Sequence, residues 1–257
     1  MTDAKSRGRF VWFELMTSDP KAAAAFYSPV TGWGTAAWDG PMPYTMWTVN
    51  GVPIGGLMQL PDASAPPFWL AHISTPNVDE TVTQAIALGA RVLAPAADIP
   101  TIGRFAVLAD PQGATFAAFT PHSAGPGGEG EPALGEFSWH ELATHDAPAA
   151  FRFYERLFAW EKTSAMDMGP MGTYQMYGRN GVVLGGMFTK PPEMPVSSWV
   201  YYVLVDNVEN AVEKVMKGGG QIVHGPMDVP GGDRVAQCLD PQGALFALHA
   251  KGHGIHR

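Results

Sequence analysis

Four polar side chains stand at matching places in the sequence, each in an apolar, β-prone stretch that precedes a predicted helix. They are Glu14, His72, Glu141 and Tyr202. A carboxylate beside an imidazole or a phenol can orient a general base, or accept a hydrogen bond from a ligand. Because an unpaired polar group in an apolar site is costly, such a pair can equally be a buried, mutually satisfied contact. A third interpretation is a displaced metal site built on Glu14 and His72.

These residues belong to a module that occurs twice in the chain. The heptapeptide Asp110–Phe116 returns almost unchanged as Asp240–Phe246. A long-period repeat seen only twice indicates two tandem domains rather than a solenoid, which needs three or more units. We expect a first module over residues 1–122, a Gly- and Pro-rich linker over 123–133, and a second module over 134–257.

Each module has the pattern of a strand, a capped helix and further strands, and then the same again. Asp19 is suited to the N-cap of the first helix, and Pro29 is expected to end that helix early. The Asn50-Gly51 dipeptide marks a hairpin. One stripe at helical spacing is assigned to the core: Ala23, Phe26, Tyr27 and Val30.

Composition limits the classes of partner. The 257 residues carry a formal net charge of −8, which argues against a nucleic-acid or anionic-membrane partner. The single cysteine, Cys238, cannot form an intrachain disulfide, and no signal segment or membrane-spanning run is present. We therefore expect a cytoplasmic protein. The histidines near the end are assigned to a frayed terminus: His249, His253 and His256.

Each module contains two β-α-β-β-β units. The first unit has an Asp cap and a Phe-Tyr helix, and the second closes on Asp-Pro-Gln-Gly. This arrangement resembles the vicinal oxygen chelate superfamily. Its members include glyoxalase I, bleomycin-resistance proteins and extradiol dioxygenases. The resemblance implies an α+β fold in which each module forms a cup-shaped mixed sheet with helices outside. The tandem duplication looks most like the double-module glyoxalase/bleomycin-resistance proteins. Because the superfamily spans many chemistries, function must be argued from the site.

The metal ligands that the resemblance implies are missing from this sequence. Metal-using members carry histidines on the first strand of each unit and glutamates on late strands. The positions of the histidines hold Trp12, Leu70, Trp139 and Val200. The positions of the glutamates hold Gly55-Gly56, Ala117, Gly185-Gly186 and Ala247. A catalytic divalent metal typically needs about three protein ligands. We therefore expect that the metal site is lost and that no cofactor is bound.

The residues two places after Trp12, Leu70, Trp139 and Val200 lie on the same face of the sheet as these four, because side chains along a strand alternate with period two. We expect Glu14 to approach His72, and Glu141 to approach Tyr202, at the floor of each cup. Two matched pairs remain open. Trp12 and Trp139 are either sheet core or a stacking wall for a planar ligand. Arg104 and Arg234 either neutralise a ligand acid or solvate a strand end.

We therefore predict a metal-free protein that binds an apolar or aromatic small molecule, with antibiotics among the candidate ligands. The alternative is a lyase, hydroxylase or dioxygenase-type enzyme that uses Glu14 and His72 as a base or as a displaced metal site. The chain is expected to be a monomer with an internal pseudo-dimer, or a homodimer. The predicted ligand contacts are Trp12, Glu14, His72, Arg104, Trp139, Glu141, Tyr202 and Arg234.

Overall fold

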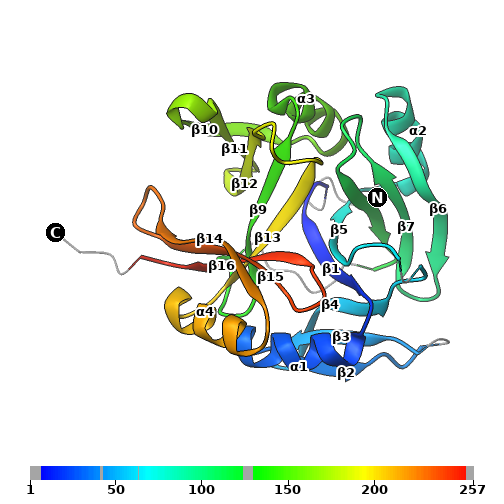
Figure 1. The fold of residues 1–257 in the computed structure, drawn as a ribbon. Helices are drawn as coiled ribbons and strands as arrows, with labels where there is room; N and C mark the ends of the chain where they lie inside the picture. Colours follow the sequence, from blue (N-terminus) through cyan, green and yellow to red (C-terminus); the bar gives the residue numbers. More distant parts are fainter. Residues whose placement is uncertain (1–6, 41–42, 63, 124–129, 253–257) are drawn as a thin grey trace. The chain divides into compact units, whose positions relative to one another are not determined.

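The computed structural model describes residues 7–40, 43–62, 64–123 and 130–252 (Figure 1). Module one contains β1 (Phe10–Thr17), α1 (Pro20–Thr31), β2 (Gly34–Ala37), β3 (Thr45–Val49), β4 (Val52–Gln59), β5 (Phe68–Ser74), α2 (Val78–Ala87), β6 (Arg91–Ile99), β7 (Gly103–Ala109) and β8 (Thr115–Pro121). Module two contains β9 (Phe137–Thr144), α3 (Ala147–Phe158), β10 (Glu161–Asp167), a short 3-10 helix (Gly169–Met171), β11 (Thr173–Arg179), β12 (Val182–Thr189), β13 (Ser198–Leu204), α4 (Val208–Lys217), β14 (Gln221–Asp228), β15 (Arg234–Leu239) and β16 (Leu245–Ala250). No helix in these ranges is long and apolar enough to cross a membrane.

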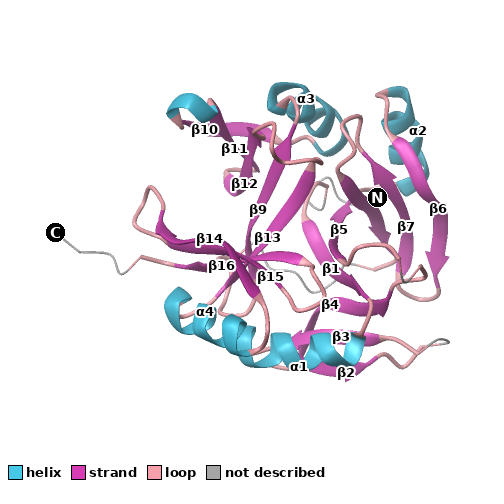
Figure 2. Cartoon of the chain, in the orientation of Figure 1, coloured by secondary structure: helices cyan, strands magenta, loops and turns pink. Residues whose placement is uncertain are grey.

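Strands dominate the structure and form two eight-stranded sheets (Figure 2). Their orders are β2-β3-β4-β1-β5-β8-β7-β6 and β10-β11-β12-β9-β13-β16-β15-β14. The sheets are mixed, because β1 is parallel to β4 and β5 to β8, whereas the hairpins are antiparallel. Module two repeats these pairings. The predicted α+β fold, with two β-α-β-β-β units in each module, is confirmed.

The chain packs into two compact units that do not follow the repeat in sequence. The first unit contains the described residues of Met1–Trp12, Leu70–Glu129 and His140–Trp199. The second unit contains those of Phe13–Trp69, Gly130–Trp139 and Val200–Arg257. The first unit therefore combines most of the second half of module one with most of the first half of module two. The second unit combines the remaining halves. The module boundaries expected from the repeat stay a prediction, and residues 124–129 of the expected linker lie outside the described residues.

Helices from different modules pack together within each unit. In the second unit α1 lies beside α4, and in the first unit α2 lies beside α3 (Figure 1). Two indoles of the repeat add matching hydrogen bonds. Trp33 Nε1 donates to the Gly135 carbonyl at 2.6 Å in the second unit, and Trp160 Nε1 donates to the Gly8 carbonyl at 2.7 Å in the first. The repeated tryptophans therefore hold each helix end to the start of the other module.

The aspartate of the repeated heptapeptide shows most directly why the halves combine in this way. Asp240 Oδ1 accepts the backbone N–H groups of Gln242 and Ala244, each at 2.9 Å, and so shapes its own loop. Its other oxygen, Oδ2, accepts the Tyr27 hydroxyl of α1 at 3.1 Å. Trp69 Nε1 in turn donates to the Tyr27 oxygen at 3.1 Å. A loop of module two is thus bonded to the first helix of module one.

The first unit contains the same chain of hydrogen bonds with the modules exchanged. The Tyr154 hydroxyl of α3 donates to Asp110 Oδ2 at 3.0 Å, and Trp199 Nε1 donates to Tyr154 at 3.2 Å. Burial raises the pKa of both aspartates, and the N–H and tyrosine donors partly offset it. Burial of Tyr27, reinforced by the charge of Asp240, raises the pKa of that phenol well above its ordinary value. The tyrosine therefore stays a donor.

One local expectation was wrong. Pro29 does not end α1 early: the helix continues to Thr31 and has the same 12-residue length as α3, which contains no internal proline. A proline in the last turn removes only one helical hydrogen bond, to the Ala25 carbonyl. Ala25 is exposed, so water can bond that carbonyl. The Thr31 hydroxyl also donates to the Tyr27 carbonyl at 2.8 Å, which closes the final turn.

We expect Tyr27→Phe to lower the free energy of unfolding by about 1–3 kcal/mol, because it leaves a buried aspartate oxygen and a buried indole N–H without their partner. Tyr154→Phe should cost a similar amount. Chemical denaturation of Tyr27→Phe, Asp240→Asn and the double variant measures the coupling between the two groups. Strictly additive losses in that cycle would contradict the stabilising role of this hydrogen bond.

Candidate functional site

Glu14 lies on β1 beside a glycine whose missing side chain makes room for a tyrosine. Glu14 pairs in register with Gly56 of β4, and Gly56 pairs with Met46 of β3. A Cβ atom at Gly56 would lie 1.6 Å from the Tyr44 hydroxyl oxygen and 2.5 Å from Glu14 Oε1. Tyr44 therefore occupies the place of any side chain at position 56, and its hydroxyl hydrogen-bonds the Glu14 carboxyl.

The environment of Glu14 changes its acidity. Glu14 is only 9% exposed, and its Oε1 is buried without a hydrogen-bond partner among the described residues. Burial raises the pKa of this carboxyl to about 7, although the hydrogen bond from Tyr44 works in the opposite direction. Near neutral pH the group therefore exists in both forms. Its protonated form can donate a hydrogen bond, and its ionised form can only accept.

Module two contains the same arrangement in the first unit. The Tyr174 hydroxyl of β11 donates to Glu141 Oε2 at 2.8 Å. A Cβ atom at Gly186 would lie 2.0 Å from Cε1 of Tyr174. The sequence reasoning identified both glutamates and both glycines but missed Tyr44 and Tyr174. The signal was present, since the two tyrosines occupy equivalent positions of the repeat.

His72 lies on β5 in the first unit, in an aromatic environment. It is 4% exposed, and its ring centroid lies 6.0 Å from that of Phe105 and 6.2 Å from that of Phe119. Burial lowers the pKa of the imidazole to about 4, against a smaller opposite effect from a hydrogen bond with the Trp12 backbone. His72 is therefore neutral at physiological pH, and no described residue hydrogen-bonds to its Nδ1.

The two expected polar pairs each combine residues from different units. Glu14 belongs to the second unit and His72 to the first, while Glu141 belongs to the first and Tyr202 to the second. The predicted approach of Glu14 to His72 and of Glu141 to Tyr202 stays a prediction. Within its own unit, the Tyr202 hydroxyl accepts a hydrogen bond from Gln237 Nε2 at 2.9 Å.

Trp12 and Trp139, which stand where the resemblance implies histidine ligands, are both only partly buried. Trp139 packs against the buried cluster of Val200, Tyr202 and Ala247. This contact agrees with a role in the sheet core, and the exposed remainder of each indole keeps a stacking role open. Both interpretations of Trp12 and Trp139 therefore remain.

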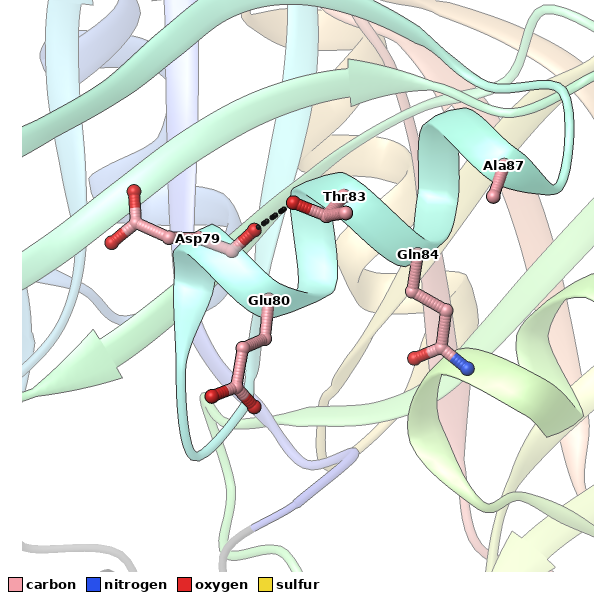
Figure 3. A pocket seen from close by; sticks show the side chains of 5 residues that line it. All are labelled: Asp79, Glu80, Thr83, Gln84 and Ala87. Atoms are coloured by element: carbon pink, nitrogen blue, oxygen red, sulfur yellow. Dashed lines mark hydrogen bonds between the residues drawn. The ribbon is translucent and has the colours of Figure 1, made fainter.

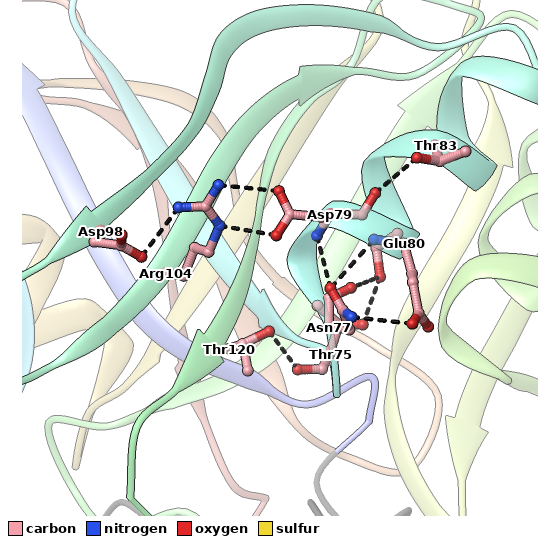
Figure 4. A network of polar contacts seen from close by, with 9 residues as sticks. Thr75, Asn77, Asp79, Glu80, Thr83, Asp98, Arg104 and Thr120 are labelled. Carbon is pink, nitrogen blue, oxygen red and sulfur yellow. Dashed lines mark hydrogen bonds and ion pairs between the residues drawn. The ribbon is translucent and has the colours of Figure 1, made fainter.

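The matched arginines are held by carboxylates. The Arg104 guanidinium makes a two-pronged contact with Asp79, at 2.9 and 3.0 Å, and a third bond to Asp98 at 3.0 Å (Figure 4). Arg234 likewise contacts two carboxylates, Glu209 through Nε and Asp228 through Nη1. A ligand acid would have to compete with two carboxylates at either arginine, and the predicted ligand role of Arg104 and Arg234 stays a prediction.

Neither of two surface hollows contains a predicted site residue. One lies on α2 and has a volume of about 400 Å³; Figure 3 shows its lining, in which the Thr83 hydroxyl bonds the Asp79 carbonyl at 2.9 Å. The other, of about 260 Å³, lies in the second unit between the end of α1 and the start of α4. The candidate site is therefore defined by the buried Glu14–Tyr44 pair rather than by these hollows.

The residues do not fit the metal that the resemblance implies. In the described part of the chain, no three His, Cys, Asp or Glu side chains are grouped so that they could hold a metal ion. In addition, Tyr44 and Tyr174 fill the space that a longer side chain at Gly56 or Gly186 would need. The positions that would carry ligands are thus occupied by aromatic and apolar groups.

Relatives of known family place this arrangement in context. The chain is 30% identical over 245 residues to the putative glyoxylase CFP32 of Mycobacterium tuberculosis, covering 92% of each chain. It is 26% identical over 259 residues to the anthracycline biosynthesis protein DnrV of Streptomyces peucetius, covering 94% of this chain and 92% of that one. These two relatives are aligned along nearly their whole length.

Solved structures agree on the fold. The Mn(II)-bound glyoxalase from Novosphingobium aromaticivorans superposes with a TM-score of 0.64 at 14% identity, over 96% of this chain and 82% of that one. The 2,3-dioxygenase LapB from Pseudomonas sp. KL28 gives a TM-score of 0.67 at 12% identity, over 96% and 94% of the two chains. At such identities the likeness concerns the fold alone.

Both modules also match known domain families. Residues 12–119 match the glyoxalase-like domain, and residues 136–248 match the glyoxalase/bleomycin resistance protein/dioxygenase superfamily. With the duplicated β-α-β-β-β units, these matches show that the chain belongs to the vicinal oxygen chelate superfamily, that of the glyoxalases, bleomycin-resistance proteins and extradiol dioxygenases.

Proposed function

We propose that the chain binds an apolar, aromatic small molecule without a metal, and that Glu14 and Tyr44 provide the polar contact. The observation that carries this proposal is the Glu14 Oε1 atom, which is buried and has no hydrogen-bond partner within the described part of the chain. Leaving a buried polar atom unpaired costs about 1–3 kcal/mol. A ligand that bonds to this oxygen would recover part of that cost.

The surrounding residues support an aromatic ligand. Trp12 lies two residues before Glu14 on β1, and its indole is only partly buried. A flat, partly exposed indole suits a planar ring, and a single buried polar atom suits one oxygen or hydroxyl substituent on such a ring. Two relatives are named anthracycline biosynthesis proteins, and these align over 94% of this chain. We therefore include planar, oxygenated polycyclic antibiotics in the proposed ligand class.

Calorimetric titration with the anthracycline doxorubicin tests this proposal. We expect Trp12→Ala to weaken binding roughly 10-fold, because the stacking surface is lost, whereas Trp12→Phe should retain most of the affinity. Trp139→Ala measures whether module two provides a second site. Binding should survive dialysis against EDTA, and elemental mass spectrometry should find less than one metal equivalent per chain.

Two outcomes would contradict the proposal. Equal affinity in the wild type, Trp12→Ala and Trp139→Ala would exclude a stacking wall. About one transition-metal equivalent per chain that survives dialysis would show that the protein is not metal-free, and Glu14 and His72 would then be the first residues to substitute. A failure to bind doxorubicin would remove this antibiotic class, and a panel of smaller phenols and quinones would then test the binding role itself.

The acidity of Glu14 predicts a pH-dependent stability. Its folded pKa of about 7 lies above the ordinary 4.5, so the folded state binds more protons between these values and stability falls as pH rises through this window. Glu14→Gln removes this loss. Relative to wild type, we expect the variant to gain on the order of 3 kcal/mol between pH 4.5 and pH 8, as measured by urea denaturation at a series of pH values.

The comparison is internally controlled. The lowered pKa values of His72 and His140, both about 4, make stability rise with pH between about 4 and 6.5, but they act equally in wild type and variant and cancel in the difference. Glu213→Gln on the exposed face of α4 is the matched substitution and should show no such trend. A pH-independent difference between wild type and Glu14→Gln would show that Glu14 titrates normally.

A further inference from the structure

Three side chains of the second unit form a hydrogen-bonded series that the binding role of Glu14 does not use. Ser138 lies on β9, His249 on β16, and Asp233 directly before β15. The Ser138 hydroxyl oxygen is 2.8 Å from His249 Nδ1, and His249 Nε2 is 2.9 Å from Asp233 Oδ2. His249 was expected in a frayed terminus; that expectation was wrong, while His253 and His256 lie outside the described residues.

The partners of Asp233 indicate the direction of each hydrogen bond for a neutral imidazole. Although burial alone would raise its pKa, the Gly252 N–H and His249 lower it overall, so this carboxyl is ionised and can only accept. The Gly252 N–H donates to Asp233 Oδ1 at 2.9 Å, which leaves Oδ2 to accept from His249 Nε2–H. In the neutral imidazole Nδ1 is then an acceptor, and the Ser138 hydroxyl donates to it.

This is the protonation pattern of an activated serine: a hydroxyl donating to an imidazole whose other nitrogen is held by a carboxylate. The base here is Nδ1 rather than Nε2, and either ring nitrogen can take a proton. The Ser138 oxygen also lies 3.3 Å from the Tyr202 carbonyl, a longer contact than the one to His249. The shorter bond therefore points the proton toward the imidazole.

The series is accessible and is not part of the repeated architecture. Ser138 is half-buried, and the side chains of His249 and Asp233 are 13% and 38% exposed. In module one the equivalent positions hold Val11, Phe119 and Gly103, none of which can form these bonds. The fold is thus built in module one without them, so they are not a requirement of the module.

The neighbouring surface is apolar. Trp139 follows Ser138 directly, and it packs with Val235 and Leu245 against the cluster of Val200, Tyr202 and Ala247. An ester with an apolar acyl group is a substrate that such a surface favours, because its carbonyl would meet Ser138 while its hydrocarbon part would lie on these side chains.

We propose that Ser138, His249 and Asp233 form a nucleophilic site that hydrolyses small apolar esters. The Ser138 oxygen bonds to the ester carbonyl carbon while its proton passes to His249 Nδ1. The carbon–oxygen bond to the alcohol then breaks, and the alcohol leaves with the proton from the imidazolium. Water, deprotonated by the same nitrogen, hydrolyses the acyl group from Ser138 and restores the serine. Asp233 holds the imidazole and stabilises its charged form.

Covalent labelling of the full chain with a fluorophosphonate tests this site directly. The serine oxygen attacks phosphorus, fluoride leaves, and the proton goes to the base. We expect peptide mass spectrometry to find the phosphonyl group on Ser138 and no label on that peptide in Ser138→Ala. His249→Gln should slow the labelling roughly 100-fold or more, since a positioned general base contributes about 10²–10⁴-fold. Hydrolysis of p-nitrophenyl butyrate should fall in parallel.

A second serine provides the matched control. The Ser64 hydroxyl donates to Asp62 Oδ1 at 2.7 Å rather than to a histidine, so Ser64→Ala should leave labelling unchanged. Circular dichroism checks that each variant is folded. No label on Ser138 in the folded wild type, or an equal rate in His249→Gln, would overturn the proposal and leave the series as a structural contact. Doxorubicin binding to the same variants reports separately on Glu14.

Discussion

The buried carboxylates of Asp110 and Asp240 each have a donor at both oxygens, and these hydrogen bonds join the two modules. Asp110 and Asp240 use one oxygen to close their own loops and the other to accept a tyrosine from the first helix of the opposite module. Neither loop can complete its hydrogen bonds from its own module. Each compact unit therefore contains parts of both modules, including one of these aspartates and the tyrosine that bonds to it.

The candidate site depends on a second steric relation, in which a tyrosine takes the place of a side chain on the neighbouring strand. Gly56 and Gly186 leave room for Tyr44 and Tyr174, and each tyrosine reaches a glutamate on the first strand of its module. Either glycine can be replaced by a residue with a longer side chain only if the tyrosine moves away. The same relation between glycine, tyrosine and glutamate is present in both modules.

The modules have diverged around this shared arrangement. Module one contributes Glu14, with its unpartnered buried oxygen, and module two contributes the series from Ser138 to Asp233, for which module one has only apolar or glycine residues. A duplicated scaffold permits this, because the aspartate–tyrosine bonds and the core tryptophans maintain both units while the remaining positions change. The two proposed activities accordingly rest on different residues and on different strands.

The sequence by itself determined the duplication and the order of strands and helices, because these follow from local patterns: apolar periodicity, capping residues and repeated motifs at counted positions. It also identified Glu14 and Glu141, since alternation along a strand is a local property. Tyr44 and Tyr174 were missed because their role depends on strand register, which brings Gly56 and Gly186 beneath them.

Only the tertiary structure decided that each heptapeptide bonds to the opposite module. The hydrogen bonds join residues 213 positions apart in one case, Tyr27 and Asp240, and 44 apart in the other, Tyr154 and Asp110, so they leave no local pattern. The same reason applies to Ser138, Asp233 and His249, which are distant in sequence and meet through the pairing of strands. At Pro29 a local rule gave the wrong prediction. The rule predicted the end of α1, but the Ala25 carbonyl that Pro29 leaves unpaired belongs to an exposed residue, so the helix can continue.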